Sequence, residues 1–288
     1  MIIALFANSS KEHAKSIATD VCKFLRNQGV TVVAEDATAH LIGAEAFSSI
    51  DVSRVDYMIS MGGDGTILRA FHAYPELNAP ILGINLGSLG FMADIKIEEI
   101  YPCLENLLSG KFNIQDRMMI QGNTAKQKTC FAINDITVHR AQNPSLINLE
   151  IFVDGVYLNT FSADGIIIST PNGSTAYSLA AGGPILTPEL QALVLTPICP
   201  HTISNRPIVL MPKKELQVRY ICEQEREPIE VAYDGFSHFP MSEGVLYVQQ
   251  ARRTFRLINM ENYDYFATLR SKLGWTGKLR AAKGTSSP

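Results

Sequence analysis

The stretch Met61-Gly62-Gly63-Asp64-Gly65-Thr66 follows an apolar run, Val55 to Ser60, and precedes a segment of helical character, Ile67 to Tyr74. This context predicts a strand, a tight glycine turn and a helix. Glycine permits positive φ and carries no Cβ, so the amide N–H groups of such a turn can approach an anion at the start of a helix. We therefore expect the turn to bind phosphate.

Asp64 is the one carboxylate in this turn. A carboxylate does not attract phosphate, so Asp64 must hold a metal ion, take a proton from a hydroxyl group, or cap the helix, as Asp often does. Two common phosphate-binding motifs do not fit. A Walker A loop needs a lysine after its glycines, and a dinucleotide fingerprint needs a third glycine that is missing here.

The composition predicts two domains and small-molecule ligands. A chain of 288 residues suits two domains of ordinary size. Charged residues make up only 18%, below the usual quarter, which favours a homo-oligomer that buries part of the surface again. A net charge of -3 argues against a nucleic-acid-binding or anionic-membrane surface.

Cysteine and histidine usage bears on compartment and metals. The five cysteines form no C-x-x-C pair, which fits reduced thiols in the cytoplasm. The sequence contains no apolar run of about 18 residues, so no membrane span is expected. The start of the chain has no basic signal region. The six histidines lack ligand spacing, so we expect no metal site made by the protein itself.

The pattern of apolar segments changes along the chain. The first part alternates strands and helices, which predicts an α/β domain with a mainly parallel sheet over residues 1–116. Short apolar runs separated by turn residues then predict a β-rich, sandwich-like domain over 117–262. A helix from Tyr263 to Leu273 and a tail complete the chain and are expected to return to the N-terminal domain. The expected strands are Ile2 to Phe6, Val30 to Ala34, 55 to 60, Ile81 to Ile84, Met118 to Gln121, Phe131 to Thr137, Leu149 to Val153, Gly165 to Ser169, Glu215 to Tyr220, Ile229 to Ala232 and Val245 to Val248.

Two further clusters carry polar side chains at the ends of apolar runs. Asp164-Gly165 and the following isoleucines lead into Ser169 to Tyr177, a loop whose hydroxyl, amide and aromatic groups suit phosphate, ribose or a base. Phe131 to Asp135 ends in an amide and a carboxylate, which suit sugar hydroxyls or an adenine edge. Each cluster alone also fits an ordinary loop or turn.

Together these segments resemble one family, the NAD kinases of the bacterial type, over nearly the whole chain. The resemblance rests on Gly62 to Thr66, Asn85-Leu86-Gly87-Ser88-Leu89-Gly90-Phe91, Asn134-Asp135, Asp164-Gly165, Thr170 to Tyr177, Gly182-Gly183-Pro184 and Lys272-Leu273-Gly274-Trp275. Lipid kinases and phosphofructokinases share a similar Gly-Gly-Asp-Gly-Thr motif. The Ser-Thr-Ala-Tyr loop and the Asn-acidic pair distinguish the NAD kinases.

The resemblance implies a two-domain NAD kinase fold and transfer of the γ-phosphoryl group of ATP, with Mg²⁺ or Mn²⁺ arriving on ATP, to the 2′-hydroxyl of the adenosine ribose of NAD. Asp64 would be the general base. It also implies a homo-oligomer, with a tetramer favoured over a dimer. The residues expected to bind nucleotide are Gly62, Gly63, Gly65, Thr66, Arg69, Phe91, Asn134, Asp135, Asp164, Ser174, Thr175, Ala176, Tyr177, Ser178 and Asp234. For Arg69, a solvated helix charge is an equal alternative to a phosphate contact.

The chain departs from the family pattern at two positions. Asp135 stands where the family often has Glu, and Asn172 replaces the usual Thr of the Thr-Pro-Thr-Gly-Ser-Thr-Ala-Tyr loop. Residues 141 to 146, where relatives place a contact, give no match. The alternatives are a lipid or sphingoid kinase, for which neither a membrane segment nor a basic amphipathic helix is present, and a non-catalytic NADP(H)-binding sensor.

Overall fold

The computed structural model describes residues 1–8, 10, 13–125, 128–202, 204–211, 213, 215–221, 228–242 and 244–275. It divides into two compact units, Met1–Ile114 with the described residues from Ile258 onward, and Gln115–Leu257. The predicted tail beyond residue 275 and Cys222 lie outside the described residues. In the described part, no helix is long and apolar enough to cross a membrane.

The first unit is built on one sheet with the strand order β3-β2-β1-β4-β5-β20-β7, and β6 pairs with β5. Strands β1 to β5 run parallel, which confirms the predicted α/β domain. The elements of this sheet and its helices are β1 Ile2–Ala7, α1 Ala14–Asn27, β2 Thr31–Ala34, α2 Asp36–Ile42, β3 Glu45–Ala46, β4 Tyr57–Gly62, α3 Asp64–Ala73, β5 Ile81–Asn85, β6 Ala93–Ile95, α4 Ile100–Leu108, β7 Phe112–Arg117, β20 Phe255–Met260 and α6 Tyr265–Leu273.

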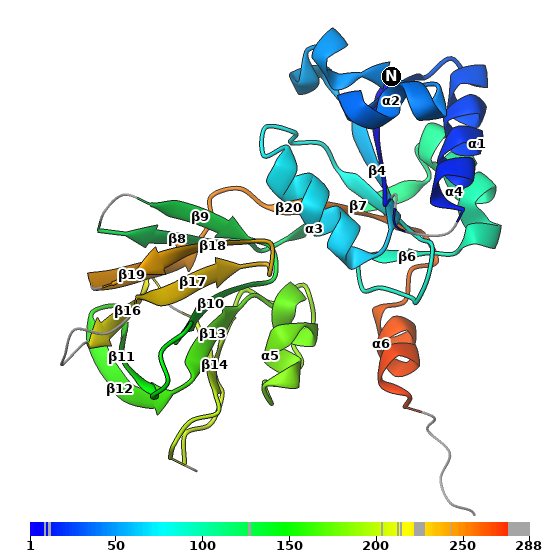
Figure 1. Ribbon diagram of the computed structural model, residues 1–288. Coiled ribbons are helices and arrows are strands. Elements are labelled where there is room, and N and C mark those ends of the chain that lie inside the picture. The colour runs from blue at the N-terminus through cyan, green and yellow to red at the C-terminus, as the bar shows by residue number, and fades with distance from the viewer. Residues whose placement is uncertain are drawn as a thin grey trace, which may run out of the picture. The chain divides into compact units, whose positions relative to one another are not determined.

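Alternating strand residues give this sheet two buried faces, as a parallel sheet requires. Apolar residues of α1 and α4, among them Val21, Leu25 and Leu104, share one core cluster with Ile3, Leu5 and other strand residues. Helix α3 lies on the other side of the sheet from α1 and α4 (Figure 1). This arrangement places the start of α3 at the carboxyl end of β4, where ligands bind in open α/β sheets.

The second unit consists of two six-stranded sheets, with the orders β15-β14-β13-β10-β17-β18 and β12-β11-β16-β19-β8-β9. All the pairings found in them are antiparallel, which confirms the predicted β-rich domain. Its elements are β8 Ile120–Thr124, β9 Thr129–Ala132, β10 Asp135–His139, β11 Ile147–Val153, β12 Val156–Ala163, β13 Gly165–Ser169, α5 Tyr177–Ala180, β14 Leu193–Ile198, β15 Ile208–Leu210, β16 Leu216–Ile221, β17 Ile229–Tyr233, β18 Ser237–Met241 and β19 Gly244–Gln250.

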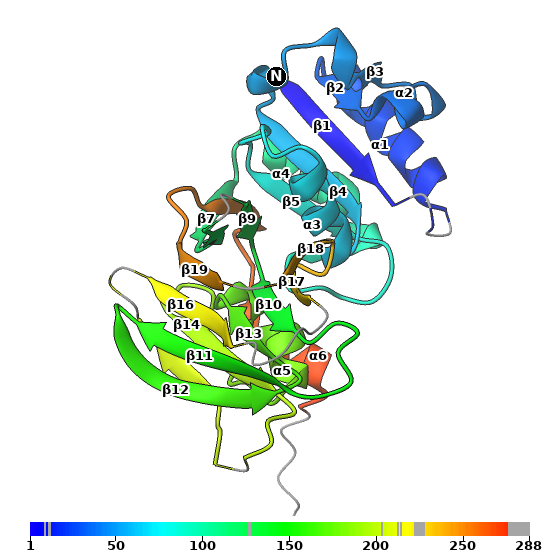
Figure 2. The ribbon, with the colours of Figure 1, turned by 60° about the vertical axis from the view of Figure 1, so that its left-hand side comes forward.

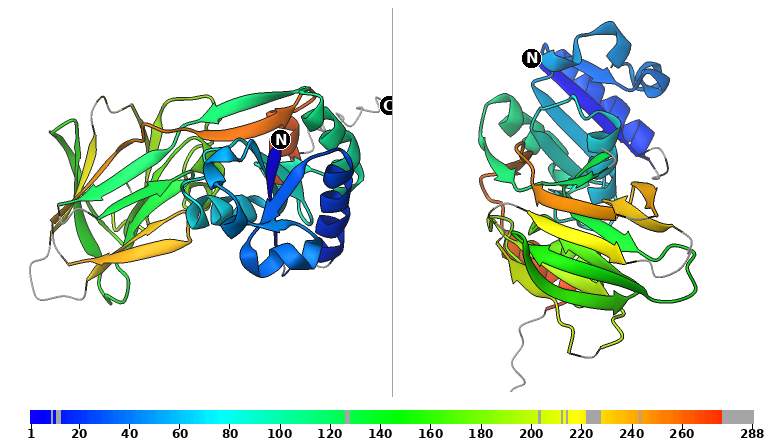
Figure 3. Two further views of the ribbon diagram at one scale, coloured as in Figure 1. Left: turned by 90° about the horizontal axis from the view of Figure 1, so that it is seen from above. Right: turned by 90° about the vertical axis from the view of Figure 1, so that its left-hand side faces the viewer.

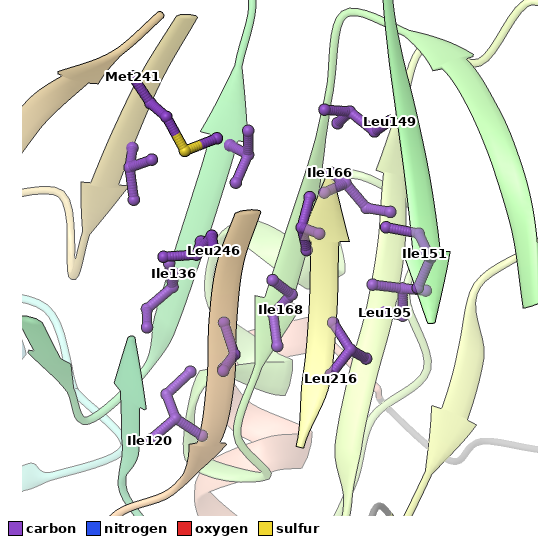
Figure 4. Packing of buried hydrophobic residues seen from close by; sticks show 14 of the residues in the cluster. Ile120, Ile136, Leu149, Ile151, Ile166, Ile168, Leu195, Leu216, Met241 and Leu246 are labelled. Carbon is purple, nitrogen blue, oxygen red and sulfur yellow. The ribbon is translucent and has the colours of Figure 1, made fainter. Parts of the chain in front are cut away.

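The two sheets form layers (Figures 2 and 3) whose inner faces share one apolar core. Ile136, Ile166 and Ile168 from one sheet extend toward Leu149 and Leu216 from the other (Figure 4). The Asp154-Gly155 turn joins β11 to β12: Val153 pairs with Val156, and both turn residues have positive φ, as a type I′ hairpin requires.

Most predicted elements differ from the observed ones in their bounds, and three of these differences have a structural cause or bear on the site. The strand predicted over Phe131 to Thr137 is two strands, β9 and β10, which are interrupted at 133 and 134. Helix α3 begins at Asp64 rather than Ile67. Helix α6 begins at Tyr265 because the Asp264 side chain accepts hydrogen bonds from the amides of residues 266 and 267 and so caps it.

Candidate functional site

The glycine turn is shorter than the sequence suggests. Strand β4 ends at Gly62 and α3 begins at Asp64, so only Gly63 lies between them, with φ of -168°. None of the glycines in this turn uses the positive φ that glycine permits. Gly62 is required for another reason: a Cβ there would lie 2.2 Å from Oγ1 of Thr66. Close packing of the first helical turn on the strand therefore excludes a side chain.

Asp64 holds a neighbouring backbone segment. Its Oδ2 accepts a hydrogen bond from the amide of Phe91 (2.8 Å), and its Oδ1 accepts bonds from the amides of Met92 (3.0 Å) and Ala93 (2.9 Å). Its side chain does not cap its own helix. A Cβ on Gly90 would lie 2.1 Å from Oδ1. The carboxylate is thus half-buried and fixed against residues 90–93.

Asn85, at the end of β5, orders the loop that leads to this segment. Its Nδ2 donates to the carbonyl groups of Ser88 (2.5 Å) and Ala93 (3.1 Å), and its Oδ1 accepts from the amide of Gly87 (2.6 Å). Phe91 is buried, and Nζ of Lys272 lies 5.8 Å from the centre of its ring. Together Asn85 and Asp64 hold the loop from both ends.

The other predicted residues of this unit lie on α3. Thr66 is buried beneath Gly62, whereas Gly65 and Arg69 are exposed on the first two turns of the helix. Their exposure leaves them accessible to a ligand at the helix N-terminus, where backbone N–H groups attract anions.

The second unit contains a cavity of about 550 Å³. Six of the predicted residues line it, together with residues that the sequence did not indicate. The lining consists of Asn134, Asp135, Thr137, His139, Arg140, Ala141, Asp164, Ala176, Tyr177, Ile198, Ala232, Asp234 and Gly235. Tyr177 is 49% exposed, so its ring is available for stacking.

Three predicted residues do not line this cavity. Ser174 is fully buried: its hydroxyl group donates to the carbonyl of Pro171 and accepts from the amide of Leu186. The hydroxyl of Ser178 is bonded to Thr196, at 2.9 Å. That of Thr175 donates to the carbonyl of residue 172. These hydroxyl groups brace the 170–178 loop from inside.

Asp234 holds the break between β9 and β10. Its Oδ2 accepts from the amide of Ile133 (2.9 Å), and its Oδ1 accepts from the amides of Asn134 (2.7 Å) and Asp135 (3.2 Å). Asp234 has a φ of 50° in the turn after β17. Asp234 therefore positions the Asn-Asp pair.

Asp135 is a buried acid. It is 6% exposed, and the hydroxyl of Thr137 donates to its Oδ1 at 3.3 Å. Burial, and then the negative charge of Asp234, raise the pKa of Asp135 to about 7. Near neutral pH this carboxyl group can therefore donate a hydrogen bond as well as accept one.

Asp164 is paired with an arginine that sequence reasoning missed. Nε of Arg140 lies 2.7 Å from Oδ1 of Asp164, and the Arg140 guanidinium also donates to the carbonyl of Asn143. The register of β10 with β13, in which His139 pairs with Gly165, brings the two residues together. A prediction that the strand after Asp135 pairs antiparallel with the strand after Asp164 would have placed Arg140 beside Asp164.

The side chain of Asn134 is bonded to Asn172, which is in turn bonded to Arg117. Arg117 is 1% exposed and was not indicated by the sequence. A Cβ on Gly173 would lie 2.1 Å from the Asn134 carbonyl oxygen. The 170–175 loop is therefore packed directly on the Asn-Asp pair. In the described part of the chain, no group of three His, Cys, Asp or Glu side chains is arranged to hold a metal ion.

Comparison with known proteins gives one consistent family. Residues 3–112 match the model of the ATP-NAD kinase N-terminal domain, and residues 133–260 match that of the ATP-NAD kinase C-terminal domain. The chain is 55% identical over 280 residues to the NAD kinase of Protochlamydia amoebophila, covering 97% of this chain and 100% of that protein. It is 37% identical over 277 residues to the NAD kinase of Moorella thermoacetica, covering 94% and 88%.

Two solved structures share the fold. The crystal structure of yeast NADH kinase complexed with NADH superposes with a TM-score of 0.87 at 24% identity, covering 98% of this chain and 90% of that one. The structure of an NAD kinase from Archaeoglobus fulgidus in complex with ATP gives a TM-score of 0.74 at 24% identity, covering 94% and 99%.

Proposed function

Because the chain belongs to the ATP-NAD kinase family, we propose that it transfers the γ-phosphoryl group of ATP to the 2′-hydroxyl of the adenosine ribose of NAD, giving NADP and ADP. The observation that best supports this proposal is the fixed carboxylate of Asp64 at the start of α3, beside a phosphate-accessible helix terminus. A carboxylate in that place attracts no phosphate, but it can accept a proton from an alcohol.

Asp64 is the general base in this proposal, and Oδ2 is its reacting atom. Oδ1 accepts two backbone hydrogen bonds and Oδ2 accepts one, so Oδ2 keeps a lone-pair direction for the hydroxyl. The ribose O–H bond breaks as the new O–P bond forms, the proton passes to Oδ2, and the bond from the γ-phosphorus to the ADP oxygen breaks. Concerted transfer is required because a carboxylate is far too weak a base to ionise an alcohol beforehand.

The glycine turn and helix α3 bind the ATP phosphates in this proposal. Backbone N–H groups at Gly63 and Gly65 provide positive electrostatic potential, and the exposed Arg69 adds a cation one turn further along. A divalent cation, Mg²⁺ or Mn²⁺, enters with ATP and neutralises charge on the phosphates. Phosphoryl transfer gains most from such positioning and neutralisation.

The cavity of the second unit binds the dinucleotide in this proposal. Its pattern of groups suits a nucleoside: an amide and an acid at Asn134 and Asp135, the paired carboxylate of Asp164, and the exposed ring of Tyr177. Aromatic stacking and a few fixed polar groups are the usual means of nucleotide recognition.

A homo-oligomer, with a tetramer favoured, is part of the proposal. Val156 (71% exposed) and Tyr157 (53%) lie on β12, and Met211 (74%) follows β15; both strands are outer strands of their sheets. Exposed apolar edge strands are surfaces that proteins cover. We expect light scattering to give the mass of a tetramer, and the Val156→Glu/Tyr157→Glu protein to give a smaller mass. The four free cysteines in the described residues fit a reducing compartment such as the cytoplasm.

The alternatives are less well supported. A lipid or sphingoid kinase shares the glycine motif but not the Asn134-Asp135 and Ala176-Tyr177 pairs that line the second-unit cavity. A non-catalytic sensor would have no need for a carboxylate fixed by three amides at the start of α3.

The test is NADP formation from NAD and Mg-ATP, detected with an NADP-specific dehydrogenase, by the wild-type protein and by Asp64→Asn. We expect wild-type turnover and a loss of kcat of at least a thousandfold in the variant, with NAD binding retained in calorimetry. Equal turnover in both proteins would remove Asp64 from the mechanism. Absence of turnover in the wild type would refute the kinase.

A further inference from the structure

The amide of Asn134 can face the cavity with either of two ends, and they have opposite hydrogen-bonding character. The oxygen end accepts and the NH₂ end donates. Which end is presented decides what kind of ligand atom Asn134 binds. Because the oxygen and nitrogen of an amide look alike in most structures, the orientation has to come from the hydrogen-bond network.

Arg117 fixes the network because a guanidinium has only donors. It is the last residue of β7 and is 1% exposed. Its terminal nitrogen donates to Oδ1 of Asn172, so the oxygen of Asn172 must face Arg117. The NH₂ group of Asn172 then faces Oδ1 of Asn134, at 2.6 Å.

On its other side, Arg117 imposes the same rule on Gln115. The Glu189 carboxylate accepts a hydrogen bond from Nε2 of Gln115, at 2.7 Å. The oxygen of Gln115 therefore faces Arg117 and accepts a bond from its Nε, at 3.1 Å. The side-chain amides of Gln115 and Asn172 thus each have a single orientation that forms both of these hydrogen bonds.

The backbone of Asn134 offers nothing to a ligand. Its N–H donates to Asp234, and its carbonyl accepts from the amide of Thr170 at 2.8 Å and from the hydroxyl of Ser169 at 3.3 Å. Recognition by Asn134 therefore depends on its side chain, whose oxygen already accepts from Asn172.

We propose that Arg117 and Asn172 are positioning residues that orient the Asn134 amide, so that its NH₂ group donates to an acceptor atom of the bound dinucleotide. The proposal rests on the proposed function, since it assumes that NAD binds in this cavity. It gives a role to Asn172, the position at which the chain departs from the threonine usual in its family.

The test is Asn172→Asp, which keeps an oxygen facing Arg117 but has no hydrogen to donate to Asn134. In this variant we expect the Asn134 amide to flip. Its NH₂ group then donates to the new carboxylate, and its oxygen faces the cavity. We expect the Kd of NAD, from calorimetry, and its KM to rise at least tenfold, while kcat at saturation stays within about threefold of the wild type.

Asn159→Asp is the matched control. Nδ2 of Asn159 also donates to the oxygen of another asparagine, Asn205, at 3.3 Å, and neither residue lines the cavity. We expect this variant to bind NAD like the wild type. An unchanged Kd in Asn172→Asp, with wild-type turnover intact, would overturn the inference and leave the kinase standing. A wild-type protein that neither binds nor phosphorylates NAD would refute the proposed function itself.

A second measurement covers the case in which Asn172→Asp does not fold. Neutron diffraction from crystals of the wild-type protein locates the amide deuterium atoms directly. Deuterium on the cavity side of Asn134 supports the proposal, and deuterium pointing to Asn172 refutes it.

Discussion

Replacing Gly90 with alanine should displace the Asp64 carboxylate and lower turnover. The new Cβ would lie 2.1 Å from Oδ1 and 2.8 Å from Cγ of Asp64, and 3.0 Å from the carbonyl oxygen of Ala93. Ordinary contact requires about 3.4 Å or more, so the carboxylate must move by about 1 Å. A misplacement of that size at a reacting group costs on the order of 100-fold in rate. We expect kcat for NADP formation to fall about 100-fold.

The KM for NAD separates this effect from general damage. None of the residues that line the second-unit cavity belongs to the 85–93 loop, so the KM should stay within about twofold. Gly29→Ala is the control: Gly29 has φ of 78°, and a Cβ added there would have no other atom within 4 Å, so alanine adds backbone strain without touching Asp64. It should lower the melting temperature but leave kcat unchanged. A Gly90→Ala protein with kcat within threefold of the wild type would refute the role given to this contact.

Three further predictions concern the second unit. Since the pKa of Asp135 is about 7 in the folded protein and about 4 when unfolded, only the unfolded chain loses this proton between pH 4 and pH 7, so stability falls across that window. The Asp135→Asn protein has no such proton to lose. In urea unfolding, its free energy of unfolding should therefore rise relative to that of the wild type by on the order of 4 kcal/mol from pH 4 to pH 7. A difference in free energy that stays constant with pH would contradict the buried acid. Asp234→Ala leaves three backbone amides without their acceptor and should cost about 3 kcal/mol or more in urea unfolding, whereas a loss below about 1 kcal/mol would mean that the 133–135 turn holds itself. Arg140→Gln removes the ion pair to Asp164 and should raise the KM for NAD about fivefold at constant kcat, an outcome that an unchanged KM would exclude.

The local sequence pattern was sufficient to predict those parts of the fold that neighbouring residues determine. The two domain types follow from apolar periodicity, and β13 has the bounds that the run of isoleucines predicts. The Asp154-Gly155 hairpin follows from turn chemistry. By contrast, β12 was not predicted, because Asn159, Thr160 and Ser162 interrupt its apolar residues and its strand lies at the edge of a sheet, where one row of backbone groups is unpaired.

Long-range contacts account for the rest. The break in the 131–137 strand depends on Asp234, about 100 residues away in the chain, which draws three consecutive amides out of the ladder. Arg117 has no motif around it, and its bond to Asn172 spans 55 residues. In the sequence, Arg117 is a charged residue at the end of a strand. The residues around it do not distinguish a buried arginine from a solvent-exposed one.

Asp64 and Asp234 show why the identity of a residue does not by itself assign it a catalytic role. Each accepts hydrogen bonds from three consecutive backbone amides, one on Oδ2 and two on Oδ1. Such a carboxylate holds a distant segment in place, and a loss of activity on its removal would follow from that alone. What differs is the setting: Asp234 is 7% exposed within a turn, whereas Asp64 is half-buried in the first turn of a helix whose N-terminus attracts phosphate. Asn at position 64 still has an oxygen for the amides but cannot take a proton as a carboxylate does, so a folded Asp64→Asn protein that binds NAD without turnover separates chemistry from support. For a folded Asp234→Asn protein, we expect kcat to stay close to that of the wild type.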